Sequence, residues 1–171
     1  MALDTTIGGA SSDSYGTLAD YESYVVANID ANFNGHGHDG AHEMHLRRAA
    51  QYLDRNFGFI GVKQYREQSM SWPRLTDKLV SGWPIDPDTV PQSIINAQFE
   101  AAYSFEFDGI DPFATLTDGA VRATRAKAGP VETQTEYALP RQTPRIVAIE
   151  GLLRDYVFGG GNSGQVRMGR G

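Results

Sequence analysis

The residue types best able to bind a metal are four histidines that lie within ten residues of one another: His36, His38, His42 and His45. Imidazole nitrogens at this density could bind zinc or nickel. His42 and His45 are three residues apart, whereas the zincin pattern H-E-x-x-H places its histidines four apart on a helix. His36 and His38 stand among glycines, which would not hold them in place. The sequence therefore favours an exposed polar loop over a metal site.

Other residue patterns give little support to catalysis. The chain has no cysteine, which excludes a disulfide, a thiolate metal site and a cysteine nucleophile. Its paired carboxylates fall at predicted helix ends or turns, where capping is a commoner role than acid–base chemistry. These pairs are Asp20/Glu22, Asp86/Asp88 and Glu106/Asp108. There is no nucleophile elbow, Walker loop or dinucleotide motif, so we expect no catalytic residue, no cofactor and no enzyme.

The aromatic residues and the charge distribution bear on nucleic-acid binding. Trp72, Trp83 and the tyrosines could stack on bases, but most aromatic positions fall on predicted inner faces, which favours core packing. The formal net charge is −6, with −5 in residues 1–60, −5 in residues 61–118 and +4 in residues 119–171. An acidic body with a basic C-terminal third indicates either two faces with different partners or ordinary surface variation.

The length and composition suit one domain with extensions. The chain has 171 residues, of which 40% are hydrophobic and 21% charged, so it can form a core. No apolar run approaches the roughly 18 residues needed to cross a bilayer, and the N-terminus does not read as a signal peptide. We expect an N-terminal arm over residues 1–16, a domain over 17–157 and a C-terminal tail over 158–171.

Apolar residues at helical spacing predict four helices. The first follows the N-cap Thr17, with Asp20 in the capping-box position, and runs to about Asn32. The second runs from about Ala41 to Phe57, and Pro91 opens the third, which ends near Phe107. The fourth runs from Pro144 to about Val157. The predicted inner faces are Leu18, Tyr21, Val25 and Ile29; Leu46, Ala49, Ala50, Leu53 and Phe57; Ile94, Ile95, Gln98, Phe99, Ala101, Ala102 and Phe105; and Ile146, Ile149, Leu152, Leu153 and Tyr156.

The segments between these helices are less regular. Residues 35–40, with three glycines, are predicted to hold no regular structure. A weak periodicity favours a short helix over Val62–Ser71, which Trp72-Pro73 would end. Residues 75–90 read as a loop because prolines and turn residues recur there. The stretch Ala49–Arg74 looks like a folding centre.

Residues 121–137 change from helical spacing to alternation, which predicts a β-hairpin over about 120–138 with Gly129-Pro130 at its turn. Its first strand carries Arg122, Arg125 and Lys127, and its second carries Glu132 and Glu136. Opposite charges that face each other across the strands would each add a few tenths of a kcal/mol. A lone two-stranded ribbon is marginal in water, so the hairpin should pack on its own helices or on a neighbouring subunit. Beyond residue 158 the chain has six glycines, two arginines and no acidic residue, and alone it should be disordered.

Short motifs spread over residues 14–157 resemble one known family in their order and spacing. They are Ser14–Tyr21, Arg48–Asp54, Gly61, Trp72-Pro73-Arg74, Val90-Pro91, Ala97, Glu100, Ala102, Lys127–Val131, Tyr137, Ile149 and Leu152-Leu153. The chain resembles the head–tail connector, or neck adaptor, proteins of tailed phages, which are often labelled DnaT-like single-stranded-DNA-binding proteins. Leu53, Trp72, Pro73, Arg74, Gly129 and Pro130 are the positions that most define the resemblance. The histidine-rich loop at 35–45 and the tail depart from it.

The resemblance implies a mainly α fold, a small bundle of about four helices with a projecting β-hairpin and extended N- and C-terminal arms. It implies a structural virion protein and no enzyme. Such proteins form a homo-oligomeric ring, commonly of about twelve subunits, beneath the portal protein and above a stopper or tail-completion protein. Double-stranded DNA passes through the lumen without specific binding. The localisation implied is the virion neck, after assembly in the host cytoplasm, with no membrane contact.

Two surfaces follow from this resemblance as hypotheses. The portal-docking element would be the tail, through Gln165, Val166, Arg167, Met168 and Arg170. The inter-subunit contact would be the hairpin, through Arg122, Arg125, Lys127, Glu132 and Glu136. The alternative function is a replication accessory that binds single-stranded DNA through Arg122, Arg125, Lys127 and nearby aromatic residues. A further alternative is an unrelated helical protein that shares short motifs by chance.

Overall fold

The computed structural model describes residues 2–34, 39–111, 113, 121–127, 132–137 and 146–158. Backbone contacts divide the chain into two compact units. The first, here called the body, comprises Met1–Ile110 and Ile146–Gly171, and the second, the hairpin unit, comprises Asp111–Arg145.

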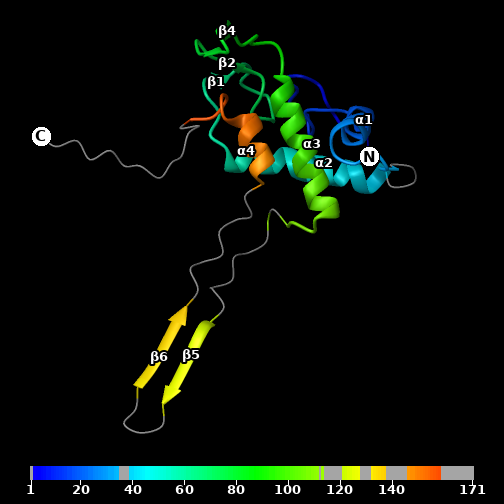
Figure 1. The fold of residues 1–171 in the computed structure, drawn as a ribbon. Helices are drawn as coiled ribbons and strands as arrows, with labels where there is room; N and C mark the ends of the chain where they lie inside the picture. Colours follow the sequence, from blue (N-terminus) through cyan, green and yellow to red (C-terminus); the bar gives the residue numbers. More distant parts are fainter. Residues whose placement is uncertain are drawn as a thin grey trace, which may run out of the picture. The chain divides into compact units, whose positions relative to one another are not determined.

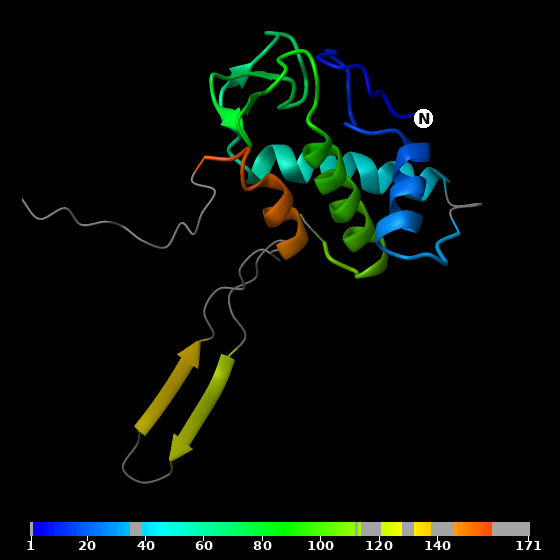
Figure 2. The ribbon, with the colours of Figure 1, turned by 45° about the horizontal axis from the view of Figure 1, so that its top comes forward.

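The body is built on four helices: α1 (Leu18–Asn28), α2 (Asp39–Asn56), α3 (Gln92–Phe107) and α4 (Val147–Leu153). Helix α3 is central, because it packs against each of the other three. Figures 1 and 2 show α1 and α4 on either side of α3, with α2 running across all of them. The prediction of a small, mainly helical fold is confirmed.

Helix boundaries follow local hydrogen bonds. The Thr17 hydroxyl accepts the Asp20 N–H at 3.2 Å, so the predicted N-cap is confirmed. Helix α1 ends at Asn28 instead of Asn32, because the chain turns at Asp30, whose carbonyl accepts the Phe33 N–H. Helix α2 starts two residues earlier than predicted, so Asp39 and Gly40 are helical. An acidic residue in the first turn suits the positive end of the helix dipole.

Helix α4 is shorter than the predicted span of Pro144–Val157. It ends at Leu153, and Pro144 lies outside the described residues. After Leu153 the chain makes one more turn, in which the Tyr156 N–H donates to the Leu153 carbonyl. It then pairs with residues 58–60: the Ile60 N–H donates to the Tyr156 carbonyl, and the Phe158 N–H donates to the Gly58 carbonyl. This pairing takes up the backbone groups that a longer helix would have used.

The predicted helix over Val62–Ser71 is wrong. Strand β1 (Val62–Lys63) instead pairs antiparallel with β2 (Arg74–Leu75). Between the strands, the buried Gln68 side chain accepts the Tyr65 N–H and donates to the carbonyls of Met70 and Pro73. One side chain thus replaces the repeating bonds of a helix. The Trp72–Pro73 peptide bond is cis.

The predicted loop 75–90 contains a second small hairpin, made of β3 (Leu79–Val80) and β4 (Trp83–Pro84). The two residues between the strands, Ser81 and Gly82, both have positive φ, 52° and 86°. That is the backbone of a type I′ turn, which matches the twist of antiparallel strands and favours glycine.

The hairpin unit contains β5 (Val121–Lys127) paired antiparallel with β6 (Glu132–Tyr137), which confirms the predicted hairpin. Its register corrects the predicted charge pairing. Lys127 lies opposite Glu132, but Arg125 lies opposite Gln134, and Glu136 lies opposite Ala123. Arg122 falls at a register shift between Val121 and Ala123. Gly129 and Pro130 lie outside the described residues.

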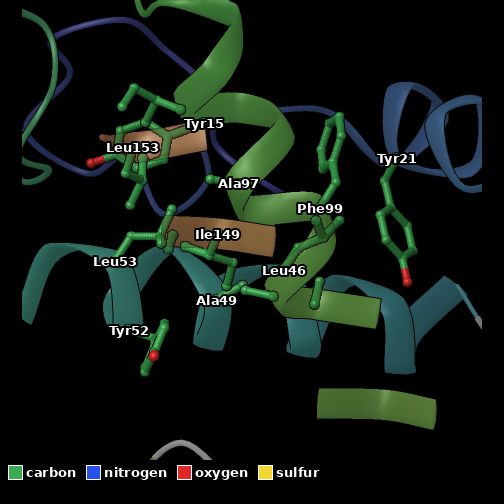
Figure 3. Close-up of a cluster of buried hydrophobic side chains, with 14 of the residues drawn as sticks. Tyr15, Tyr21, Leu46, Ala49, Tyr52, Leu53, Ala97, Phe99, Ile149 and Leu153 are labelled. Atoms are coloured by element: carbon green, nitrogen blue, oxygen red, sulfur yellow. The ribbon is translucent and has the colours of Figure 1, made fainter. Parts of the chain in front are cut away.

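The core of the body receives side chains from all four helices (Figure 3). Most predicted inner positions are buried, including Tyr21, Leu46, Leu53, Phe99 and Ile149. Half-buried side chains of the predicted set pack around them, and these are Leu18, Ile29, Phe57, Ile95, Ile146, Leu152 and Tyr156. No helix within the described ranges is both long and apolar enough to span a membrane.

Candidate functional site

The stretch Ala49–Arg74 supplies much of the core. Leu53 is fully buried, and Trp72 is 2% exposed. The Trp72 ring meets Phe59 and Tyr156 edge-on, each with a centroid distance of 5.8 Å. Trp72 therefore joins the loop after α2 to the segment after α4.

Arg74 holds the backbone of that loop together by hydrogen bonds. Its guanidinium donates to three backbone carbonyls: Ile60 at 2.7 Å, Gly61 at 2.6 Å and Ser71 at 3.1 Å. The side chain is half-buried, so these bonds replace water as its partners. Arg74 thus positions backbone and offers little of its charge to an external anion.

Asp54 connects α2 to two other segments. One carboxylate oxygen accepts the Tyr15 hydroxyl, and the other accepts the Ser71 N–H at 2.9 Å. Burial raises the pKa of Asp54, and burial also raises the pKa of Tyr15. A buried carboxyl with a raised pKa can act as a general acid or base. Here, however, both carboxylate oxygens accept hydrogen bonds from the protein itself, so the evident role of Asp54 is to hold Tyr15 and Ser71 against α2.

Gln98 fastens the N-terminal segment to the helices. It is fully buried on α3, and its side-chain oxygen accepts the backbone N–H groups of Tyr15 and Gly16 at 3.0 and 3.1 Å. Its amide nitrogen donates to the Ser14 hydroxyl and the Leu46 carbonyl. Residues 2–16 lack helix and strand, as expected of an arm, yet their end is bonded to the centre of the core. A polar residue on an otherwise apolar helical stripe was the signal for this role.

His42 and His45 do not lie in the exposed loop that the sequence favoured, because both belong to α2. His42 is 1% exposed, and its Nδ1 lies 2.8 Å from Glu106 Oε2 on α3. Its ring packs against Tyr21 and Phe33. Because α2 begins at Asp39, His42 falls on the inner face of that helix. His45 is half-buried, and burial lowers its pKa.

Metal-ligand geometry is not found in the part of the chain that the structure describes, where no three histidine or acidic side chains are grouped as a metal site requires. His36 and His38 lie outside the described residues. The acidic pairs hold turns and helix ends: Asp20 and Asp108 stand at helix termini, Asp86 accepts the Asp88 N–H, and Asp88 accepts the Tyr65 hydroxyl.

The main exposed aromatic side chain was missed by the sequence reasoning. The sequence placed Trp83 in the loop 75–90 and favoured core packing for the aromatic residues as a group, but Trp83 is 76% exposed at the β3–β4 hairpin. The Ser81-Gly82 turn was the available signal, because it forces strand pairing where a loop was predicted. Beside Trp83 lies a groove of about 240 Å³, lined by Val80, Trp83, Pro84, Ile85, Asp86, Thr89, Pro91 and Tyr156.

The predicted portal-docking residues Gln165, Val166, Arg167, Met168 and Arg170 lie outside the described residues. For the predicted inter-subunit residues of the hairpin, the structure gives the backbone register alone. The described residues of the body carry seventeen acidic and eight basic side chains, a formal charge of −9. Such a surface repels phosphate and is therefore poorly suited to coating nucleic acid.

These features define a small, mainly helical protein whose buried polar groups fasten its own backbone. The model of the family described as "Putative DnaT-like ssDNA binding protein" matches residues 1–171. The chain belongs to that family. No curated protein and no solved structure matches it closely enough to count as a relative.

Proposed function

We propose that this protein is a structural adaptor, a head–tail connector of a tailed phage, and that it has no catalytic activity. In this proposal its copies form a closed ring beneath a portal protein, with a stopper or tail-completion protein below. The ring extends the channel for double-stranded DNA in the virion neck. The proposal rests on the resemblance carried by the motifs at residues 14–21, 48–54, 72–74 and 127–131.

The observation that carries the proposal is that β5 and β6 belong to a compact unit of their own. A two-stranded ribbon is marginally stable by itself in water. A seven-residue strand paired with a six-residue one is therefore best explained as a device for contact with another subunit. A ring supplies that contact with the same surfaces on every copy.

The acidic body agrees with a DNA channel. A formal charge of −9 over the described body opposes tight binding of phosphate, so DNA would slide past without being held. The test is co-sedimentation of the purified protein with portal rings through a density gradient. The proposal expects the two to migrate together, and separate migration at saturating concentrations would oppose it. Removal of residues 159–171 should abolish the co-migration if Arg167, Met168 and Arg170 anchor the ring.

The second candidate is the activity in the family's description, binding of single-stranded DNA. The basic residues Arg122, Arg125 and Lys127 on β5 would contact the phosphates, and exposed aromatic residues would stack on bases. This candidate predicts tight binding that weakens steeply with salt. Fluorescence anisotropy of a labelled oligonucleotide across a salt series measures it. The adaptor proposal expects weak binding or none.

A further inference from the structure

The groove beside Trp83 has the chemistry of a site for a cationic side chain. Two aromatic residues, Trp83 and Tyr156, line it together with the acidic residue Asp86. A guanidinium over an aromatic face gains from the ring quadrupole, and a nearby carboxylate adds an ion pair. The backbone holds Trp83 in place, because Val80 and Trp83 are paired across the type I′ turn.

In the sequence, the chain itself carries such cations a few residues after one that lines the groove. Tyr156 lines the groove, and the described backbone ends at Phe158, held to Gly58 by a bond of 2.7 Å. The thirteen residues that follow include Arg167 and Arg170 and no acidic residue, whereas the described body has a formal charge of −9. Charge complementarity therefore favours contact between this segment and the body.

We propose that the C-terminal segment 165–171 docks in the Trp83 groove of its own chain, with Arg167 or Arg170 placed between the Trp83 ring and Asp86. Arg167 lies nine positions after Phe158, and a glycine-rich chain of about nine residues has a typical span of about 15–18 Å. A tether this short gives an effective concentration in the millimolar range. A separate copy reaches that concentration only in a very concentrated solution, which favours the chain's own segment as the occupant.

The consequence is that the C-terminal segment is less available to other binding partners while it occupies the groove. While Arg167 and Arg170 sit in the groove, they are withheld from other acidic surfaces, and a partner must compete with the groove to bind them. This inference does not depend on the adaptor proposal, because it concerns the isolated protein. Its test needs no portal and no DNA.

The experiment uses the tryptophan fluorescence of the full chain. The protein has two tryptophans, and Trp72 is 2% exposed whereas Trp83 is 76% exposed. Quenching by acrylamide therefore reports mainly on Trp83. With an effective concentration and a dissociation constant both in the millimolar range, about half of the molecules are docked. The double variant Arg167→Ala/Arg170→Ala should then show a quenching constant up to about twofold higher than the wild type.

Two matched variants sharpen the test. Asp86→Asn removes the carboxylate from the groove and should raise quenching in the same direction. Arg66→Ala removes an arginine that is 95% exposed and lies outside the groove lining, and it should change nothing. If the double arginine variant quenches like the wild type, the proposal fails. If the difference between them grows over about a hundredfold increase in protein concentration, the occupant is a second copy and the own-chain proposal is overturned.

Discussion

Replacing Gln98 with leucine should destabilise the protein strongly, because this side chain holds the N-terminal segment to the core. Leucine is similar in size, so the substitution removes hydrogen bonds without opening a large cavity. The side-chain oxygen is the acceptor for the Tyr15 and Gly16 N–H groups, and both bonds are buried. The Leu46 carbonyl also loses a donor, but it belongs to α2 and keeps its position in that helix.

The magnitude follows from the two N–H groups left without an acceptor. Each buried, unsatisfied donor costs about 1–3 kcal/mol, so Gln98→Leu should lower the free energy of unfolding by about 2–6 kcal/mol. Urea denaturation followed by circular dichroism measures this free energy. Amide hydrogen exchange at Tyr15 and Gly16 should also speed up more than exchange within α3, since the N-terminal segment detaches first.

The matched control is Gln92→Leu on the same helix. Gln92 is exposed and bonds Asn96 one turn away, so its loss should cost less than about 0.5 kcal/mol. A change below about 1 kcal/mol for Gln98→Leu would refute the reasoning, because it would mean that water or local movement satisfies both donors.

Three further predictions concern the folding centre. Gly61 has a φ of +76°, and an added Cβ would overlap the Leu75 carbonyl oxygen, so Gly61→Ala should cost at least about 1–2 kcal/mol in thermal or urea unfolding. Arg74→Lys keeps the charge but loses the planar fork that bonds three carbonyls, and it should cost about 1–3 kcal/mol. Burial raises the pKa of Asp54 above its ordinary value of 3.8, so the folded state binds this proton more tightly than the unfolded state. The free energy of unfolding of the wild type, relative to that of Asp54→Asn, should therefore be greatest below pH 3.8 and should fall as the pH rises through the raised pKa of Asp54. Urea titrations over a pH series measure this difference. A difference that rises with pH would contradict the assignment.

The helices could be read from the sequence because their signals are strong and local. Apolar residues recur at helical spacing from Ile94 to Phe105, and Pro91 and Gly109 flank that run. The structure places α3 at Gln92–Phe107, one residue from the predicted start. Helix α4 was predicted too long, because its last turn is replaced by pairing with residues 58–60. Sequence spacing within one segment does not report such a distant partner.

The folding centre could be located but its structure could not be derived. Trp72-Pro73-Arg74 marks the stretch, yet the strands β1 and β2 depend on contacts made by Gln68 and Arg74 over several residues. His42 shows the same limit, because its partner Glu106 is 64 residues away. The exposure of Trp83 follows from the conformation of a two-residue turn, where composition alone favoured burial.

The measurement that tests the central proposal most directly is mass by light scattering, first for the protein alone and then with a purified portal ring. The adaptor proposal predicts a complex in which the number of bound copies matches the number of portal subunits, whatever the state of the free protein. An unchanged portal mass, together with nanomolar and salt-sensitive binding to single-stranded DNA, would contradict it and support the DNA-binding alternative.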